Sequence, residues 1–201
     1  MTETLCVLNS FLKYIVKFLL VFAILYYGTF AFIGLAAPGG YYIPFFDHYL
    51  NYPAWLRTSL LMGSRELLIL LGYHPFLQDK YVIKLPEGAS VRMVYACLGY
   101  GIMSFWTAFV FANTGSWKRK LTWIAGGLVS IWFINVVRIS ILLVANSRSR
   151  NMPFGIDHHT WFNICAYILV FALMYLYDAR FRSTRNSFNS VEKKSAGFSE
   201  P

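Results

Sequence analysis

Long apolar runs dominate the chain, and polar residues gather in the shorter stretches between them. Four of these runs are long enough to cross a hydrocarbon layer of about 30 Å as helices that rise about 1.5 Å per residue. They cover Phe11–Leu35, Met93–Asn113, Leu121–Val144 and Trp161–Tyr177. The pattern therefore predicts an all-α polytopic membrane protein with about four transmembrane helices.

Two segments between the first and second predicted spans follow different patterns. Thr58–Gly72 is apolar but short, and Arg65 and Glu66 interrupt it, so it predicts an interfacial or re-entrant helix. Farther along, the side chains of Tyr81–Leu85 and Ser90–Val94 alternate and flank a turn rich in proline and glycine. This arrangement predicts a short extracytoplasmic β-hairpin.

The composition supports a membrane protein. Of the 201 residues, 57% are hydrophobic and only 13% are charged, which leaves too little polar surface to cover a water-soluble globule. This excludes a soluble globular enzyme, a disordered chain and a disulfide-rich secreted module. The lipid bilayer is thus the first expected partner.

The net charge of +9 indicates an orientation in the membrane. Lys118–Lys120 and Arg180–Arg185 stand beside predicted spans, which places them in the cytoplasm and the loop Asn146–Thr160 outside. No RNA- or DNA-binding motif accompanies the charge, so no nucleic-acid partner is expected. Ser183–Pro201 is polar and aperiodic and predicts a disordered cytoplasmic tail, while residues 1–182 are expected to form a single integral-membrane domain.

The cysteines and histidines give no metal or disulfide pattern. Cys6, Cys97 and Cys165 form no CxxC pair, which argues against a disulfide or a zinc site. Adjacent His158 and His159 do not share a helix face, and the HExxH pattern is absent. We therefore expect neither a metal nor a cofactor, and we expect Cys6 and Cys165 to be replaceable.

Arg138 is the most unusual residue of the predicted spans, because ionisable groups within apolar spans are expensive and often functional. It lies roughly 9 Å below the outer end of the third span, a depth from which its side chain can also reach the interface by snorkelling. Asn135, three residues earlier on the same face, favours a polar stripe.

Cys97 and His159 begin the second and fourth predicted spans on the same outer side. Alone, a buried cysteine is usually a small hydrophobe and an interfacial histidine a hydrogen-bonded structural group. Together they supply a nucleophile and its proton acceptor, and Arg138 adds a positive charge for an oxyanion. A helix N-terminus and a nearby arginine favour the thiolate, and Gly99 admits a close substrate backbone.

These residues resemble the motifs of the exosortase/archaeosortase family of membrane-embedded cysteine transpeptidases. Ala96-Cys97-Leu98-Gly99 is similar to the family's Cys-Ser-Gly signature, Asn135–Ile139 to its Asn-x-x-Arg segment, and His159 to the histidine that opens the last core helix. The resemblance covers roughly Leu67–Tyr177. Leu98 replaces the usual serine, and Asn163 replaces the usual glycine four residues after the histidine.

The resemblance implies that Cys97 is the nucleophile, His159 the general base and acid, and Arg138 the stabiliser of the oxyanion or thiolate. Asn135, His158 and Gly99 would support them. It also implies a bacterial inner-membrane enzyme that cleaves the C-terminal sorting signal of secreted proteins (a short motif, a transmembrane helix and a basic tail) and transfers the product to an envelope acceptor. Two alternatives are an intramembrane protease that uses water as acceptor and a non-catalytic subunit of an envelope polysaccharide or protein export assembly.

Overall fold

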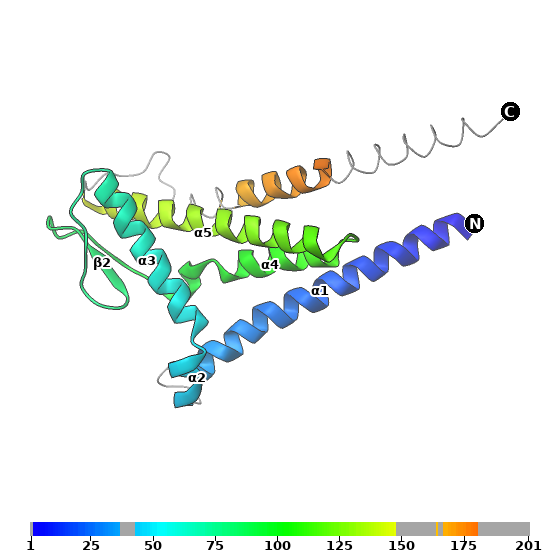
Figure 1. Ribbon diagram of the computed structural model, residues 1–201, viewed down its shortest axis with the longest axis horizontal. Helices are drawn as coiled ribbons and strands as arrows, with labels where there is room; N and C mark the ends of the chain where they lie inside the picture. The colour runs from blue at the N-terminus through cyan, green and yellow to red at the C-terminus, as the bar shows by residue number, and fades with distance from the viewer. Residues whose placement is uncertain (1, 37–42, 148–163, 165–166, 181–201) are drawn as a thin grey trace. The chain divides into compact units, whose positions relative to one another are not determined.

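The computed structural model describes residues 2–36, 43–147, 164 and 167–180 of the chain, and this part is mostly helical (Figure 1). The helices are α1 (Thr2–Ala36), α2 (Pro44–Tyr49), α3 (Tyr52–Leu70), α4 (Tyr100–Ala112), α5 (Trp117–Ser147) and a C-terminal helix over residues 167–180. Backbone contacts divide the chain into two compact units, Met1–Phe162 and Asn163–Pro201. The predicted tail, Ser183–Pro201, and most of the predicted outer loop lie outside the described residues.

A small antiparallel sheet lies between α3 and α4 in the sequence, with strand order β1-β2-β3. Its strands are β1 (Phe76–Leu77), β2 (Val82–Lys84) and β3 (Ser90–Arg92), and Lys84 pairs with Ser90 across the turn. The predicted hairpin is therefore confirmed. The first strand was not predicted, because two exposed residues are too short a run to show a period.

The helix predicted at Thr58–Gly72 is present as α3 but begins earlier, at Tyr52, and its interfacial or re-entrant placement stays a prediction. The side-chain oxygen of Asn51 accepts a hydrogen bond from the Ala54 amide at 3.0 Å, and Pro53 occupies the first turn, where no amide hydrogen is needed. Gly72, at a φ of 84°, follows the helix in a left-handed conformation. Six more residues, among them Arg57, thus belong to this helix.

The second predicted span, Met93–Asn113, is wrong in its first third. Strand β3 is followed by a 3₁₀ turn, η1 (Tyr95–Leu98), and α4 begins only at Tyr100. Gly99, at a φ of 75°, separates the two helical segments, because a left-handed residue interrupts the helical path. The apolar run does not indicate this break, because hydropathy describes the side chains and not the backbone conformation.

Close approaches hold α3, α4 and α5 together. A Cβ at Gly63 would lie 2.9 Å from the Trp132 ring, and the Trp132 indole donates to the Ser59 hydroxyl at 3.1 Å, which locks α3 onto α5. Between α4 and α5, the Trp106 indole lies over Gly127 and donates to a backbone carbonyl of α5 at 3.1 Å. Glycine makes both approaches possible because it has no Cβ.

Helix α1 packs on α4 through aromatic rings that recur along its face. The ring of Phe105 meets Phe18 edge-on at 5.3 Å between centroids, and Tyr100 meets Phe30 at 5.6 Å in the same way. Edge-to-face contacts of this kind add about 0.5–1.5 kcal/mol to simple burial. This row packs α4 against α1.

Two described helices are long and apolar enough to cross a membrane, Phe11–Ala36 and Trp117–Ser147. They match the first and third predicted spans, and large apolar side chains remain exposed on both, such as Phe11, Ile24 and Val129. Helix α4 is apolar but has only 13 residues. Part of the fourth predicted span lies outside the described residues, so the count of four spans stays a prediction.

Candidate active site

The turn that carries Cys97 packs against the protein core. Cys97 lies in η1, where its backbone amide donates to the Val94 carbonyl at 2.9 Å. Leu98 is fully buried in a cluster with Val136 and Ile139 of α5, and the half-buried, unoxidised Cys97 packs against the same cluster. Burial of Leu98 holds the short turn in place, and Cys97 remains partly exposed.

The prediction that Cys97 lies in the first turn of a long transmembrane helix is wrong. Cys97 precedes α4, whose N-cap is Gly99, and occupies a separate four-residue 3₁₀ turn. A helix macrodipole acts mainly within the first turn of its own helix. Cys97 therefore lies outside the first turn of α4.

Gly99 brings the Cys97 turn directly against α5. Its φ of 75° lies in the left-handed region, and a Cβ built on it would collide with the Asn135 side-chain nitrogen. The Gly99 carbonyl also accepts the Met103 amide at 3.0 Å, which starts the hydrogen bonding of α4. Among the described residues, the group that approaches Gly99 closely is thus the Asn135 amide, where the sequence suggested a substrate backbone.

Two of the predicted site residues, Asn135 and Arg138, lie on α5. Asn135 is only 6% exposed and touches the Gly99 position, as described above. Arg138 follows three residues later on the same helix and is half-buried. The structure therefore joins the Cys97 turn to the Asn135 end of the predicted polar stripe, while the role of Arg138 at the thiol stays a prediction.

The histidines of the predicted site, His158 and His159, lie outside the described residues, and so does Cys165. The proton acceptor therefore rests on the sequence alone. Across residues 2–36, 43–147, 164 and 167–180, no group of three or more His, Cys, Asp or Glu side chains is arranged to hold a metal ion.

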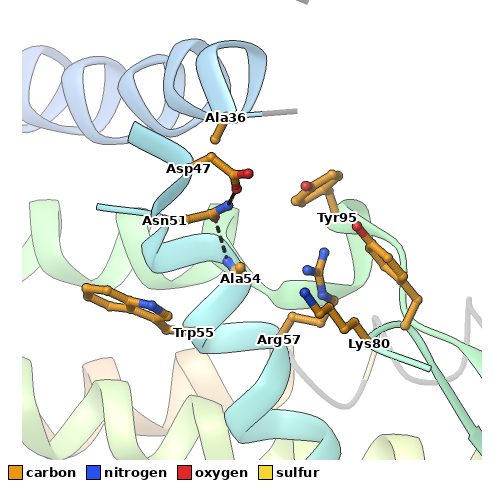
Figure 2. Close-up of a pocket in the computed structure, with 9 residues that line it drawn as sticks. Ala36, Asp47, Asn51, Ala54, Trp55, Arg57, Lys80 and Tyr95 are labelled. Carbon is orange, nitrogen blue, oxygen red and sulfur yellow. Dashed lines mark hydrogen bonds between the residues drawn. The ribbon is translucent and has the colours of Figure 1, made fainter. Parts of the chain in front are cut away.

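A second polar site lies close to the Cys97 turn and was missed by the sequence analysis. Arg57 of α3 is 5% exposed and lines a cavity of about 380 Å³ together with Tyr95, the first residue of η1 (Figure 2). The helix was expected to begin at Thr58, one residue too late to include this arginine. The Asn51 cap and Pro53 would have located the true start.

The family model described as Transmembrane exosortase (Exosortase_EpsH) matches residues 9–176 of the chain. No curated protein and no solved structure matches the chain. The match spans the aromatic face of α1, the hairpin, the Cys97 turn and Asn135–Arg138 of α5. Because it covers most of the sequence, the chain belongs to the transmembrane exosortase family.

Proposed function

We propose that the chain is a membrane-embedded cysteine transpeptidase that processes C-terminal sorting signals of secreted proteins at the outer face of a bacterial inner membrane. The observation that carries this proposal is the Cys97 turn: a half-buried free thiol, fixed by Leu98 and Gly99 on the face of α5 that bears Asn135. A nucleophile needs such fixed placement next to groups that stabilise charge. Family membership supports the activity class.

In the proposed reaction the Cys97 thiolate attacks the carbonyl carbon of the peptide bond, and a C–S bond forms. The tetrahedral oxyanion faces the positive charge of Arg138. The C–N bond then breaks, and the departing amine takes the proton that His159 accepted from the thiol. An acceptor nucleophile gives its proton to His159 and attacks the thioester, which releases the transferred protein and restores the thiolate.

The contacts at the two ends of α4 support the proposed orientation. Cys97 precedes the N-terminus of α4, whereas the ammonium of Lys120 donates at 3.0 Å to the Phe111 carbonyl in its last turn. Lys17 of α1 lies over the Phe111 ring at 4.9 Å, at the same end. Positive residues concentrate on the cytoplasmic side, so this end faces inward and the Cys97 turn outward. The proposed topology has four spans.

The test is processing of a co-expressed secreted substrate that carries a C-terminal helix and a basic tail. Cys97→Ala is expected to abolish cleavage, with a loss of at least about a hundredfold, because a covalent mechanism has no substitute nucleophile. Cys6→Ala, at the far end of α1, is the matched control and is expected to cleave normally. Unchanged processing by Cys97→Ala at equal membrane levels would contradict the proposal and favour a non-catalytic subunit.

A further inference from the structure

At the end of α4 away from Cys97, basic side chains gather around a single aromatic ring. The ammonium of Lys17 in α1 lies 4.9 Å from the ring centroid of Phe111, and that of Lys120 in α5 lies 5.5 Å from the same centroid. The Trp117 ring lies 5.6 Å from the Phe111 ring and 5.5 Å from the Lys120 ammonium. Three helices thus contribute to one group of residues, Lys17, Phe111, Trp117 and Lys120, which we call the Phe111 cluster.

Lys120 carries its charge in a buried position. It is 7% exposed, and its ammonium donates to the Phe111 carbonyl at 3.0 Å. An ammonium has three N–H donors and a full charge, so a neutral carbonyl and aromatic rings compensate only part of the cost of burying it. The ammonium of Lys17, close to the same ring, adds like-charge repulsion. An anion bound near both lysines would lower both costs.

The three helices supply no carboxylate close to these charges. Helices α4 and α5 contain no Asp or Glu, and α1 contains only Glu3. Glu3 stands 14 residues before Lys17, which is about 21 Å along a helix that rises about 1.5 Å per residue. The packing of α1, α4 and α5 therefore leaves the Phe111 cluster positive.

The start of α5 adds to this positive field. Lys118, Arg119 and Lys120 all lie in its first turn, which contains no acidic residue. The N-terminus of a helix carries a partial positive charge, so cations are unfavourable there and an anion is favourable. The backbone and the side chains thus favour a ligand of the same sign.

We propose that the Phe111 cluster binds the phosphate of an anionic phospholipid, with Lys17 and Lys120 as its ligands. Helices α1 and α5 are long and apolar enough to cross a membrane, and the chain belongs to a transmembrane family. Lys17 lies six residues inside the apolar part of α1, a depth from which a lysine reaches the phosphate level by snorkelling. The inference is independent of the Cys97 chemistry, and the proposed orientation places this lipid in the cytoplasmic leaflet.

Exposed apolar side chains beside the two lysines favour a lipid over a free phosphate ion. Val16 and Leu20, which are close to Lys17 in α1, are exposed. Leu121, next to Lys120 in α5, is exposed as well. These side chains offer an apolar surface to acyl chains, whereas a free phosphate ion has no apolar part to bury. The positive charge favours a headgroup without a cation of its own, such as phosphatidylglycerol, over phosphatidylcholine.

The experiment measures lipid binding by the full-length, delipidated protein in detergent. Native mass spectrometry gives the dissociation constant of the first bound lipid for phosphatidylglycerol and for phosphatidylcholine with identical acyl chains. We expect phosphatidylglycerol to bind at least tenfold more tightly. Lys17→Gln should reduce this preference about fivefold, and Lys17→Gln combined with Lys120→Gln should abolish it. Equal binding of the two lipids by the wild type, or an unchanged preference in Lys17→Gln, would overturn the inference.

Matched variants separate charge recognition from a folding defect. Lys17 is exposed, so Lys17→Gln should keep the helix content of the wild type in far-UV circular dichroism, and Lys17→Arg should keep the lipid preference. Lys80→Gln is the control, because Lys80 is an exposed lysine near the opposite end of α4, where it lines the cavity at Tyr95. It should keep the full preference, and a loss as large as that of Lys17→Gln would refute the Phe111 cluster as the site.

Glycerol phosphate carries the same phosphate without acyl chains and distinguishes a lipid from a soluble anion. We expect no bound glycerol phosphate at a concentration at which phosphatidylglycerol saturates the first site. Binding of glycerol phosphate at that concentration, lost in Lys17→Gln, would identify a site for soluble phosphate and overturn the inference. Because the lipid titration needs no substrate, its outcome bears on this inference alone, and processing by Cys97→Ala bears on the proposed function alone.

Discussion

Gly99→Ala is the substitution whose effect follows most directly from the geometry around Cys97. Two separate terms oppose a methyl group there. A φ of 75° costs a residue with a Cβ about 1–2 kcal/mol, and the new Cβ would overlap the Asn135 side-chain nitrogen. Overpacking of this kind costs about 1–3 kcal/mol when the neighbour is itself buried, as Asn135 is. The expected loss in free energy of unfolding is therefore about 2–5 kcal/mol.

Gly72→Ala is the matched control, because only the backbone cost applies at that position. Gly72 has a φ of 84°, and a Cβ built there meets nothing within 4 Å. We therefore expect a loss of only about 1–2 kcal/mol. The measurement is unfolding by SDS titration from mixed micelles, followed by far-UV circular dichroism, for both variants and the wild type.

Asn135→Ala separates the packing term from the backbone term. In the Asn135→Ala background, Gly99→Ala should cost about as much as Gly72→Ala, because the overlapping amide is gone. If Gly99→Ala is no worse than Gly72→Ala in the wild-type background, the close approach between the Cys97 turn and α5 is refuted. A Gly99→Ala protein that keeps full processing would contradict the fixed placement of the thiol.

Two further pairs of substitutions test the helix packing by the same unfolding measurement. Gly127→Ala should lower the free energy of unfolding by about 1–3 kcal/mol, because an indole ring lies over that position. Gly126→Ala has open space around it and should raise the free energy of unfolding by about 0.5–1 kcal/mol through its higher helix propensity. Equal effects of the two substitutions would refute the α4–α5 contact. Lys120→Met removes the hydrogen bond to the Phe111 carbonyl and should lower the free energy of unfolding by about 1.5–3 kcal/mol. Lys118 is exposed, so Lys118→Met should change it by no more than about 0.5 kcal/mol. An unchanged stability of Lys120→Met would contradict the role of Lys120 at the C-terminal end of α4.

The apolar runs predicted the helices well where one period continued without a break. Both ends of α5 lie within a few residues of the third predicted span, and α1 contains the first. The hairpin was also predictable, because alternating side chains flanked a strong turn signal. Local signals of these kinds act over a few residues and need no knowledge of the tertiary contacts.

The misplaced features depended on backbone direction or on distant residues. Gly99 breaks the second apolar run with a left-handed conformation, and the Asn135 side chain that packs against it is far away in sequence. Arg57 was missed because its helix was started too late, and its burial arises from rings that the hairpin and η1 contribute. Of the candidate site, Cys97 and Asn135 were both predicted as site residues, whereas the contact of the Cys97 turn with Asn135 and the neighbouring cavity were not predicted.

The central claim is that Cys97 carries the substrate as a thioester, and intact-mass analysis of the purified protein after incubation with a sorting-signal substrate tests it most directly. We predict a covalent adduct with the mass of the acyl fragment, located at Cys97, released by neutral hydroxylamine, and absent from Cys97→Ala. Adduct formation should fall in His159→Ala, because His159 accepts the thiol proton and protonates the departing amine in the step that forms the thioester. Processing that continues with no adduct, or an adduct that persists in Cys97→Ala, would contradict the account.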